Sequence, residues 1–267
     1  MFHRNKQLNF KDKWVLVTGA SSGLGRQMCI DLAETYGAKI LALARSTDKL
    51  RSLQKQIKEK SDIEIYSVDL TDTKKLHTTF TELVAKHELY AVILNAGVTA
   101  FDLDHQVDLT RKKQLIATNV AHTTELAHLA IQYFRQSNQP GGILFISSMA
   151  SRIPLPWQAL YSATKSFITH YASALAWENR NSGITISVSL PGGIQTEMIR
   201  KNELDHLSAW LLPVEKASHL TLEGFRKGKK VFTLTFLDAL QVFLAKVAPQ
   251  GLVNQVLDRV YRKPSKK

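Results

Sequence analysis

Six short apolar runs, separated by stretches with helical spacing, constrain the fold of this chain more than any other feature. Each run is rich in Val, Ile and Leu and is bounded by turn residues or a helical pattern, at residues 14–17, 39–44, 64–68, 90–94, 142–146 and 185–190. Runs without polar alternation are typical of strands that are covered on both faces. Because strands and helices alternate and no linker rich in Pro, Gly or Ser divides the chain, the sequence predicts a single α/β domain with a doubly wound parallel sheet.

The carboxyl-terminal segment departs from this alternation. Apolar side chains at Phe232, Leu234 and Phe236 alternate as in a seventh strand, and apolar residues then recur at helical spacing over 237–247 and 252–260. Residues 224–267 also carry ten Lys and Arg against two Asp. We therefore expect about seven strands within residues 1–234 and a basic, amphipathic helical extension of the same domain at 235–267.

Charge and cysteine content exclude several classes of protein. The 267 residues include 35 Lys and Arg and 23 Asp and Glu, for a formal net charge of +12, but the excess is concentrated in the tail. No interleaving of aromatic and basic residues and no zinc-ligand spacing accompanies it, so nucleic acid is not an expected partner. Cys29 is the only cysteine and residues 1–13 lack the apolar stretch of a secretory signal, which together favour a cytoplasmic protein.

A glycine-rich turn follows the first apolar run. The segment from Thr18 to Gly25 reads Thr-Gly-Ala-Ser-Ser-Gly-Leu-Gly and leads into a helical pattern. Such glycines allow a tight turn and the close approach of a pyrophosphate to a helix N-terminus, where unpaired amides favour negative charge. About 20 residues after Gly25, where an acidic residue would bind an adenosine ribose hydroxyl, the chain has Ala44 and Arg45. Arg45 can pair with a 2′-phosphate, so the sequence favours NADP(H) over NAD(H).

A second set of residues is suited to proton transfer. Tyr161 and Lys165 are four residues apart in a helical stretch, where the ammonium would lower the pKa of the phenol. Ser148 lies just after the fifth apolar run, at the carboxyl edge of the sheet where open α/β proteins bind ligands. Metal chemistry is not expected, because only His122, Glu125 and His128 have ligand-like spacing and no second such step faces them.

In their order and spacing these elements resemble the short-chain dehydrogenase/reductase family, over roughly residues 10–198. The shared residues also include Asp69-Leu70, Asn95-Ala96-Gly97, Asn119 and the segment Pro191-Gly192-Gly193-Ile194-Gln195-Thr196. The resemblance implies a Rossmann-type NADP(H)-binding catalytic domain at residues 1–234, with a substrate lid at 196–213.

The resemblance also implies a role for each residue of the site. Tyr161 would donate a proton to the carbonyl, Ser148 would polarise the substrate oxygen, Lys165 would bind the nicotinamide ribose, and Asn119 would hold a water that leads a proton to Lys165. The implied cofactor contacts are Gly19, Ser21, Ser22, Gly23, Leu24, Gly25, Arg45, Asp69, Leu70, Asn95, Ala96, Gly97, Tyr161, Lys165, Pro191, Gly192, Ile194 and Thr196. With Ser148, the expected substrate contacts are Leu155, Trp157, Met198, Leu207 and Trp210.

These residues predict an NADPH-dependent reductase of a lipophilic ketone or aldehyde, with an acyl, steroid-like or retinoid-like carbonyl. The alternative is a dinucleotide-binding sensor or scaffold without turnover, although such a protein would have no need of a tuned phenol. The resemblance implies a homodimer rather than a tetramer, because the extension departs from the short terminus of tetrameric members. For the extension itself, a membrane span over residues 231–248 is disfavoured by its charges Asp238 and Lys246 and by the strand-like alternation of its first half. The other two interpretations are peripheral contact with an anionic membrane and packing of both helices on the protein or its partner subunit.

Overall fold

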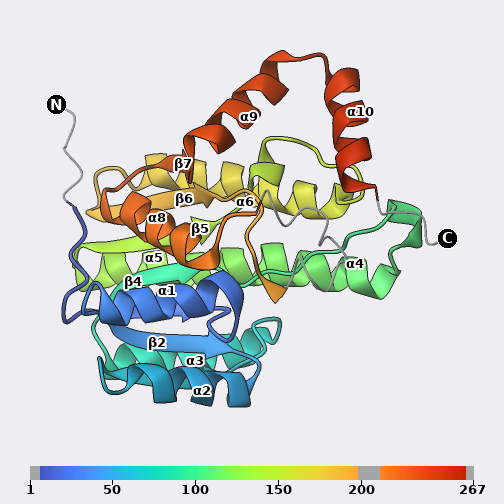
Figure 1. Cartoon of the computed structure of the whole chain (residues 1–267). Coiled ribbons are helices and arrows are strands. Elements are labelled where there is room, and N and C mark those ends of the chain that lie inside the picture. The colour runs from blue at the N-terminus through green and yellow to red at the C-terminus, as the bar shows by residue number, and fades with distance from the viewer. Residues whose placement is uncertain (1–6, 198–210, 263–267) are drawn as a thin grey trace.

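A seven-stranded parallel sheet forms the centre of the molecule. The computed structural model describes residues 7–197 and 211–262, and within them the strand order is β3-β2-β1-β4-β5-β6-β7 (Figure 1). The strands are β1 (Trp14–Thr18), β2 (Lys39–Ala44), β3 (Ile63–Ser67), β4 (Leu89–Leu94), β5 (Gly141–Ile146), β6 (Ile184–Leu190) and β7 (Val231–Thr233). The predicted doubly wound α/β fold is therefore confirmed, and the six apolar runs lie on the first six strands.

Helices cover both faces of the sheet. The helices are α1 (Gly23–Glu34), α2 (Thr47–Ile57), α3 (Thr73–Lys86), α4 (Leu109–Ile116), α5 (His122–Ser137), α6 (Ala159–Glu178), α8 (Val214–Arg226), α9 (Phe236–Val247) and α10 (Gln250–Tyr261). One apolar core joins the sheet to α1, α2 and α8, and the other joins it to α3, α5 and α6. Helical spacing accounts for this packing, as in α2, where Leu50, Leu53 and Ile57 are the buried residues.

The sheet reverses its winding between β1 and β4, and side chains of both strands join there. Thr18 Oγ1 accepts hydrogen bonds from the backbone N–H groups of Asn95 and Ala96, both at 3.0 Å. The Asn95 amide donates to the Thr18 carbonyl, also at 3.0 Å. Because ligands of open α/β sheets bind at the carboxyl ends of strands where the winding reverses, these contacts stabilise the floor of the expected site.

The tail forms two helices, as predicted, but a shorter strand than expected. The prediction of a strand through residue 236 is wrong, since β7 ends at Thr233 and α9 begins at Phe236. A capping box ends the extended segment: the Thr235 hydroxyl accepts from the Asp238 N–H and the Asp238 carboxylate accepts from the Thr235 N–H, both at 3.0 Å. Helices α9 and α10 then form an arch beside β7 and α6 (Figure 1). Among the described residues, no helix has both the length and the apolar content needed to cross a membrane.

Candidate active site

A cavity of about 540 Å³ opens at the carboxyl ends of the strands, on the side of the glycine turn. It is lined by most of the residues that sequence analysis assigned to the cofactor. These are Gly19, Ser21, Ser22, Gly23, Leu24, Arg45, Asp69, Leu70, Asn95, Ala96, Gly97, Tyr161, Lys165, Pro191, Gly192, Ile194 and Thr196. The structure thus brings residues from six separate segments of the chain to one cavity.

The glycine turn lies at the start of α1. Gly19 has a φ of +67°, and a Cβ there would lie 2.9 Å from the Asn95 side-chain nitrogen. Gly25 does not line the cavity: a Cβ on it would lie 2.4 Å from the Gly19 carbonyl oxygen, so this glycine allows close packing beneath the turn. The Ser22 side chain makes no capping hydrogen bond and the first turn of α1 holds no acidic residue. No side-chain cap therefore occupies the first backbone N–H groups of α1. An anion site at a helix N-terminus requires such free donors.

Basic residues gather at one end of this cavity. Arg45 and Lys49 both line it, with Ser21 and Ser46 beside them. Sequence analysis missed Lys49, although its position four residues after Arg45, near the start of α2, could have indicated it. The Lys49 ammonium pairs with Glu197 at 3.1 Å, and both side chains are about half exposed.

The Asp69 carboxylate lies on the same cavity. Its pKa is lowered by hydrogen bonds from the backbone N–H and the hydroxyl of Thr71, with a smaller contribution from Arg45. Asp69 is therefore ionised at neutral pH, and its oxygens can accept hydrogen bonds from a ligand.

The α6 helix carries Tyr161 and Lys165 into the cavity. The Lys165 ammonium donates to the Ile146 carbonyl at 2.9 Å and lies 5.8 Å from the centroid of the Tyr161 ring. Lys165 is 6% exposed, and burial lowers its pKa to about 8. The ammonium therefore keeps its charge at neutral pH.

The pKa of Tyr161 differs from the prediction. Burial raises it, a hydrogen bond with Ser148 lowers it in part, and the nearby phenol of Tyr261 adds to the increase. The expectation that Lys165 lowers this pKa is therefore wrong for this structure, because desolvation of the phenolate dominates. The phenol consequently holds its proton at neutral pH.

Asn119 lies beneath the cavity rather than on its wall. It falls within the π-helical turn η2 (Ala117–Ala121) and is 2% exposed. Its side-chain oxygen accepts from the Val98 N–H at 2.8 Å, and its amide donates to the Val98 carbonyl at 2.9 Å and to the Thr164 hydroxyl at 3.1 Å. Asn119 thus holds the loop after β4 against α6, close to Lys165. The expected water relay through Asn119 remains a prediction.

The expected substrate residues are only partly brought together. Ser148 lines the cavity, whereas Leu155 and Trp157 do not. Trp157 has a φ of +68° and its indole N–H donates to the Asp258 carboxylate on α10 at 2.9 Å, so it holds the tail against the body. Met198, Leu207 and Trp210, and most of the lid expected at 196–213, lie outside the described residues.

Two residues that sequence analysis did not assign lie near this site. Tyr261, at the end of α10, contacts Phe101 with ring centroids 5.9 Å apart and influences the pKa of Tyr161. Tyr261 lies four residues after Leu257 and eight after Val253, which puts all three on one helical face. This spacing could have indicated that Tyr261 faces the body.

His122 is the other residue, and it is neither on the surface nor fully hydrogen-bonded. It is 1% exposed, and its Nδ1 makes no hydrogen bond of normal geometry to the described residues. Burial lowers its pKa to about 4, so the ring is neutral at physiological pH. Among the described residues, no group of three or more His, Cys, Asp or Glu side chains is arranged to hold a metal ion.

Comparison with known proteins identifies the family. The family model described as short chain dehydrogenase matches residues 13–206. The chain belongs to this family. A solved short-chain dehydrogenase from Sphingobium yanoikuyae in complex with NADPH superposes with a TM-score of 0.78 at 25% identity, covering 89% of this chain and 96% of that one.

Two curated relatives differ in what their names say. The rat very-long-chain 3-oxoacyl-CoA reductase is 31% identical over 215 residues, which cover 74% of this chain and 65% of the relative. The human inactive hydroxysteroid dehydrogenase-like protein 1 is 25% identical over 259 residues, which cover 94% of this chain and 78% of the relative. Family membership therefore shows an oxidoreductase fold and ancestry, and turnover has to be argued from the site.

Proposed function

We propose that this protein is an NADPH-dependent reductase of a ketone or aldehyde on a lipophilic substrate, with Tyr161 as the proton donor. The observation that carries the proposal is the meeting of Ser148, Tyr161 and Lys165 on the same cavity as the glycine turn and Arg45. A cavity that binds a dinucleotide and also places a protonated phenol beside a serine hydroxyl is equipped for carbonyl reduction.

The residues present fit NADPH. Gly19 has no Cβ and so leaves room for a pyrophosphate. The uncapped N-terminus of α1 supplies backbone N–H donors to it. Arg45 and Lys49 offer two cations for a 2′-phosphate, and the ionised Asp69 offers acceptors to an adenine amino group. The structural relative with bound NADPH supports the same assignment.

Each side chain then has a task in the reaction. When bound, NADPH supplies the hydride to the carbonyl carbon. The Ser148 hydroxyl donates a hydrogen bond to the carbonyl oxygen, and the Tyr161 phenol transfers its proton to that oxygen as negative charge develops there. Lys165, charged at neutral pH, stabilises the phenolate that remains and would donate to the ribose hydroxyls of bound NADPH.

The raised pKa of Tyr161 suits a proton donor. A proton donor must be protonated before the reaction, and burial keeps the phenol in that form at neutral pH. Oxidation of an alcohol would need the phenolate as a base, and that form is populated only at higher pH.

The proposed substrate class follows from the names of relatives and from the apolar rings near Tyr161. Relatives are named for very-long-chain 3-oxoacyl-CoA and for 17-beta-hydroxysteroids. Tyr261 and Phe101 place apolar rings near Tyr161, and buried apolar area favours long or ring-bearing substrates. We therefore propose acyl, steroid-like or retinoid-like carbonyls.

A non-catalytic dinucleotide-binding protein is the second candidate, because one relative is named as inactive. A binder without turnover has no need of the hydrogen-bonded Ser148 and Tyr161 pair.

The Tyr161→Phe variant tests the proposal. Loss of the phenolic proton should reduce kcat by about 100-fold or more, while the NADPH dissociation constant stays within about twofold. Oxidation of NADPH would be followed by absorbance with 3-oxoacyl thioesters, steroid ketones and retinaldehyde, and NADPH binding by fluorescence. Tyr171→Phe, in the same helix, is the matched control and should keep its activity. A wild-type protein that binds NADPH but turns over none of these carbonyls would favour the non-catalytic candidate.

A further inference from the structure

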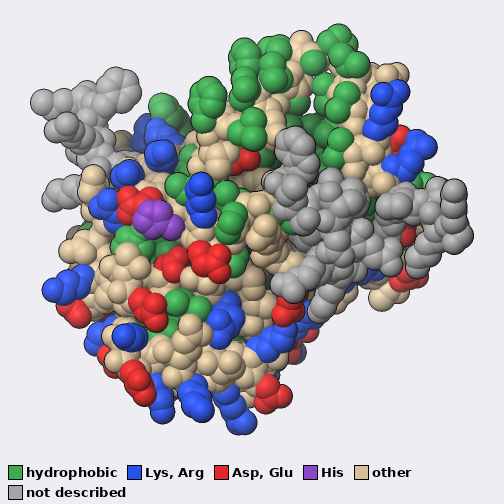
Figure 2. All heavy atoms as spheres, in the orientation of Figure 1, with side chains coloured by type: hydrophobic (Ala, Val, Ile, Leu, Met, Phe, Trp, Pro, Cys, Tyr) green, Lys and Arg blue, Asp and Glu red, His purple; other side chains and the backbone are tan. Residues whose placement is uncertain are grey.

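The α9 helix presents its large apolar side chains to solvent. These side chains form one stripe at positions spaced by three, four and seven residues, made of Phe236, Leu237, Leu240, Phe243, Leu244 and Val247. Phe236 is 84% exposed and Phe243 60%. Within α9, which the structure describes in full, no side chain is buried. Figure 2 shows hydrophobic side chains gathered over the arch of α9 and α10 at the top of the molecule.

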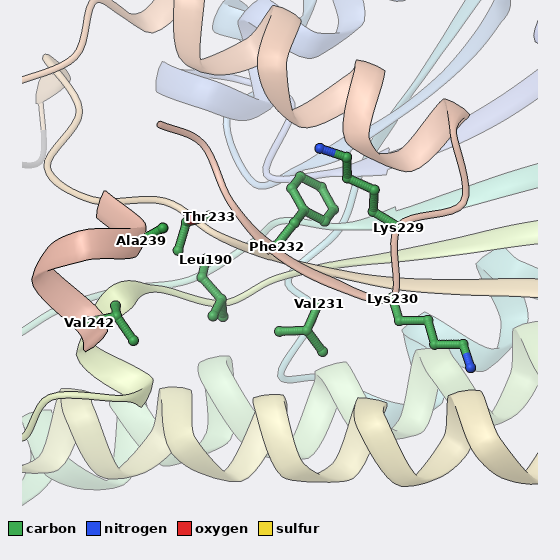
Figure 3. Close-up of a pocket in the computed structure, with 8 residues that line it drawn as sticks. All are labelled: Leu190, Lys229, Lys230, Val231, Phe232, Thr233, Ala239 and Val242. Carbon is green, nitrogen blue, oxygen red and sulfur yellow. The ribbon is translucent and has the colours of Figure 1, made fainter. Parts of the chain in front are cut away.

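The opposite side of α9 faces the body with the half-buried Asp238, Val242 and Ala245. Val242 lines an open cavity of about 570 Å³ together with the exposed Ala239, Leu190 of β6 and Val231 of β7 (Figure 3). A helix of a water-soluble domain normally turns its larger apolar residues inward. In α9 this order is reversed, so the outer stripe is unlike the usual exposed face of a surface helix.

Contacts with the body fix which side of α10 faces solvent. Val253 is buried, Asp258 accepts from the Trp157 indole, and Tyr261 contacts Phe101, which together hold one side of α10 on the body. Leu252 and Val256 lie on the other side and are each more than half exposed. The outer sides of α9 and α10 therefore form one apolar surface held by a packed base.

Cations flank this apolar surface. Lys229 and Lys230 line the same cavity on the side away from Ala239 and Val242, and Lys246 and Arg259 are exposed on the two helices. The acidic residues of the described tail are occupied, since Asp238 completes the α9 cap and Asp258 bonds Trp157 and Arg262. An apolar surface bordered by unneutralised Lys and Arg matches the charge of an anionic lipid surface.

We propose that the outer faces of α9 and α10, with Lys229 and Lys230, form a docking surface for an anionic lipid bilayer. A second copy of this chain fits the surface less well, because a twofold contact would bring the same lysines against each other. A bilayer instead offers phosphate groups to the cations and acyl chains to Phe236, Phe243 and Leu244.

Docking would also bring the lipid close to the candidate active site. Helix α10 meets the lipid with Leu252 and Val256, while its other side carries Tyr261 toward Tyr161. This step rests on the proposed function: a carbonyl compound dissolved in the bilayer would enter the site beside α10.

Vesicle co-sedimentation tests the docking surface. The full-length protein should bind vesicles that contain phosphatidylserine at about 50 mM salt, bind vesicles of phosphatidylcholine alone much more weakly, and lose at least about fivefold of its binding at about 500 mM salt. A Phe243→Ser/Leu244→Ser variant should bind at least about tenfold more weakly, since two large apolar side chains are lost. Leu103→Ser, which alters a 37% exposed leucine outside α9, α10 and the α4 and α6 surface, should bind normally.

The charge contribution is tested in the same assay. Lys229→Glu/Lys230→Glu should weaken binding to anionic vesicles at least about tenfold, whereas Lys58→Glu/Lys60→Glu, with the same change of net charge at the end of α2, should have much less effect. Absence of binding to anionic vesicles at low salt, or equal losses in the test and control variants, would overturn the proposal. The proposal would also be overturned if the wild type did not bind vesicles and the Phe243→Ser/Leu244→Ser variant had a lower oligomeric state in light scattering. That result would assign the surface to a second copy of the chain.

Two further measurements separate docking from folding and from catalysis. NADPH affinity of each variant reports whether its fold is intact. With a ketone held in vesicles, the Phe243→Ser/Leu244→Ser variant should lose kcat/KM, and with a small water-soluble ketone it should not. If vesicles bind but no carbonyl is reduced, the docking surface stands and only the proposed function fails.

Discussion

Arg45 and Lys49 differ in how freely each can pair with a phosphate. The Lys49 ammonium already contacts Glu197 at 3.1 Å. The backbone carbonyl of Arg45 accepts a hydrogen bond from the Ser67 hydroxyl, and its exposed side chain lines the cavity. We expect NADPH to bind at least about tenfold more tightly than NADH, because a charge-assisted phosphate contact is worth about 1.5–3 kcal/mol. Arg45→Ala should remove most of that preference and Lys49→Ala less.

Titration of the two cofactors by fluorescence measures this preference. Arg51 is an exposed arginine on α2, the helix that carries Lys49, and Arg51→Ala serves as the control. This variant should leave both dissociation constants unchanged. Equal affinity of the wild type for NADPH and NADH would contradict the assignment of Arg45.

His122 should make stability depend on pH between 7 and 5. Its pKa in the folded protein is about 4, below the ordinary value of 6.5, so the unfolded chain binds the proton first as pH falls. Protonation therefore favours unfolding, and the contribution of His122 to the free energy of unfolding should fall by about 2 kcal/mol between pH 7 and pH 5. Urea unfolding at both pH values should show that the free energy of unfolding falls less in His122→Gln than in the wild type.

A second measurement checks His122 without a substitution. In NMR titration of the wild type its ring signals should stay constant from pH 7 to pH 5, because the ring remains neutral. A midpoint near 6.5 for those signals would refute the buried, neutral state.

Sequence reasoning identified residues well where a backbone motif fixes their place. The glycine turn, Asn95 and the Tyr161 and Lys165 pair follow from strand ends and helical spacing, and all lie on one cavity. Lys49, Tyr261 and the buried state of His122 were missed, because each depends on how distant elements pack. The pKa of Tyr161 was predicted in the wrong direction for the same reason, since spacing gives the neighbour but not the degree of burial.

At the scale of elements, one hydrogen bond joins α10 to the body near the site, beside the packing of Val253 and Tyr261. The Trp157 indole donates to Asp258 at 2.9 Å, and Trp157 adopts a φ of +68° that bulky residues rarely adopt. Asp258→Ala leaves this indole without its acceptor and so weakens the attachment of α10. Because α10 is a short terminal helix, we expect local opening of α10 rather than global unfolding.

Hydrogen exchange over residues 250–261 measures this opening and should rise about tenfold in Asp258→Ala. Arg262→Ala breaks only the exposed pair with Asp258 and should have a small effect. Unchanged exchange in Asp258→Ala would show that Val253 and Tyr261 suffice to hold the helix.

Element boundaries show where the sequence signal was strong. The buried strands β2 and β4 match their apolar runs to within one residue, because a covered strand is apolar along its whole length. The end of β7 was misplaced by three residues, because the alternation of Leu234 and Phe236 continued past the Thr235 cap. Here the local capping box overrides the strand-like pattern.

At the scale of the whole molecule, the exposed apolar side chains form two separate surfaces. One is the outer face of α9 and α10. The other lies on α4 and α6, which pack together and expose Leu109, Ile116 and Phe167. Phe167 is 45% exposed and stacks on Tyr171 with ring centroids 5.9 Å apart, so it offers a flat aromatic surface that a partner could cover.

We expect this second surface to join two copies of the chain in a homodimer, with the arch of α9 and α10 obstructing the sheet-edge contact at β7 that a tetramer would use. Light scattering at micromolar concentration should give the mass of a dimer. Phe167→Asp would place two carboxylates near the twofold axis and remove apolar area, which should shift the protein to monomers while NADPH binding persists. Because the arch and the α4 and α6 surface are separate, Phe243→Ser/Leu244→Ser should remain dimeric. A stable tetramer of the wild type, or a dimer unaffected by Phe167→Asp, would contradict this arrangement.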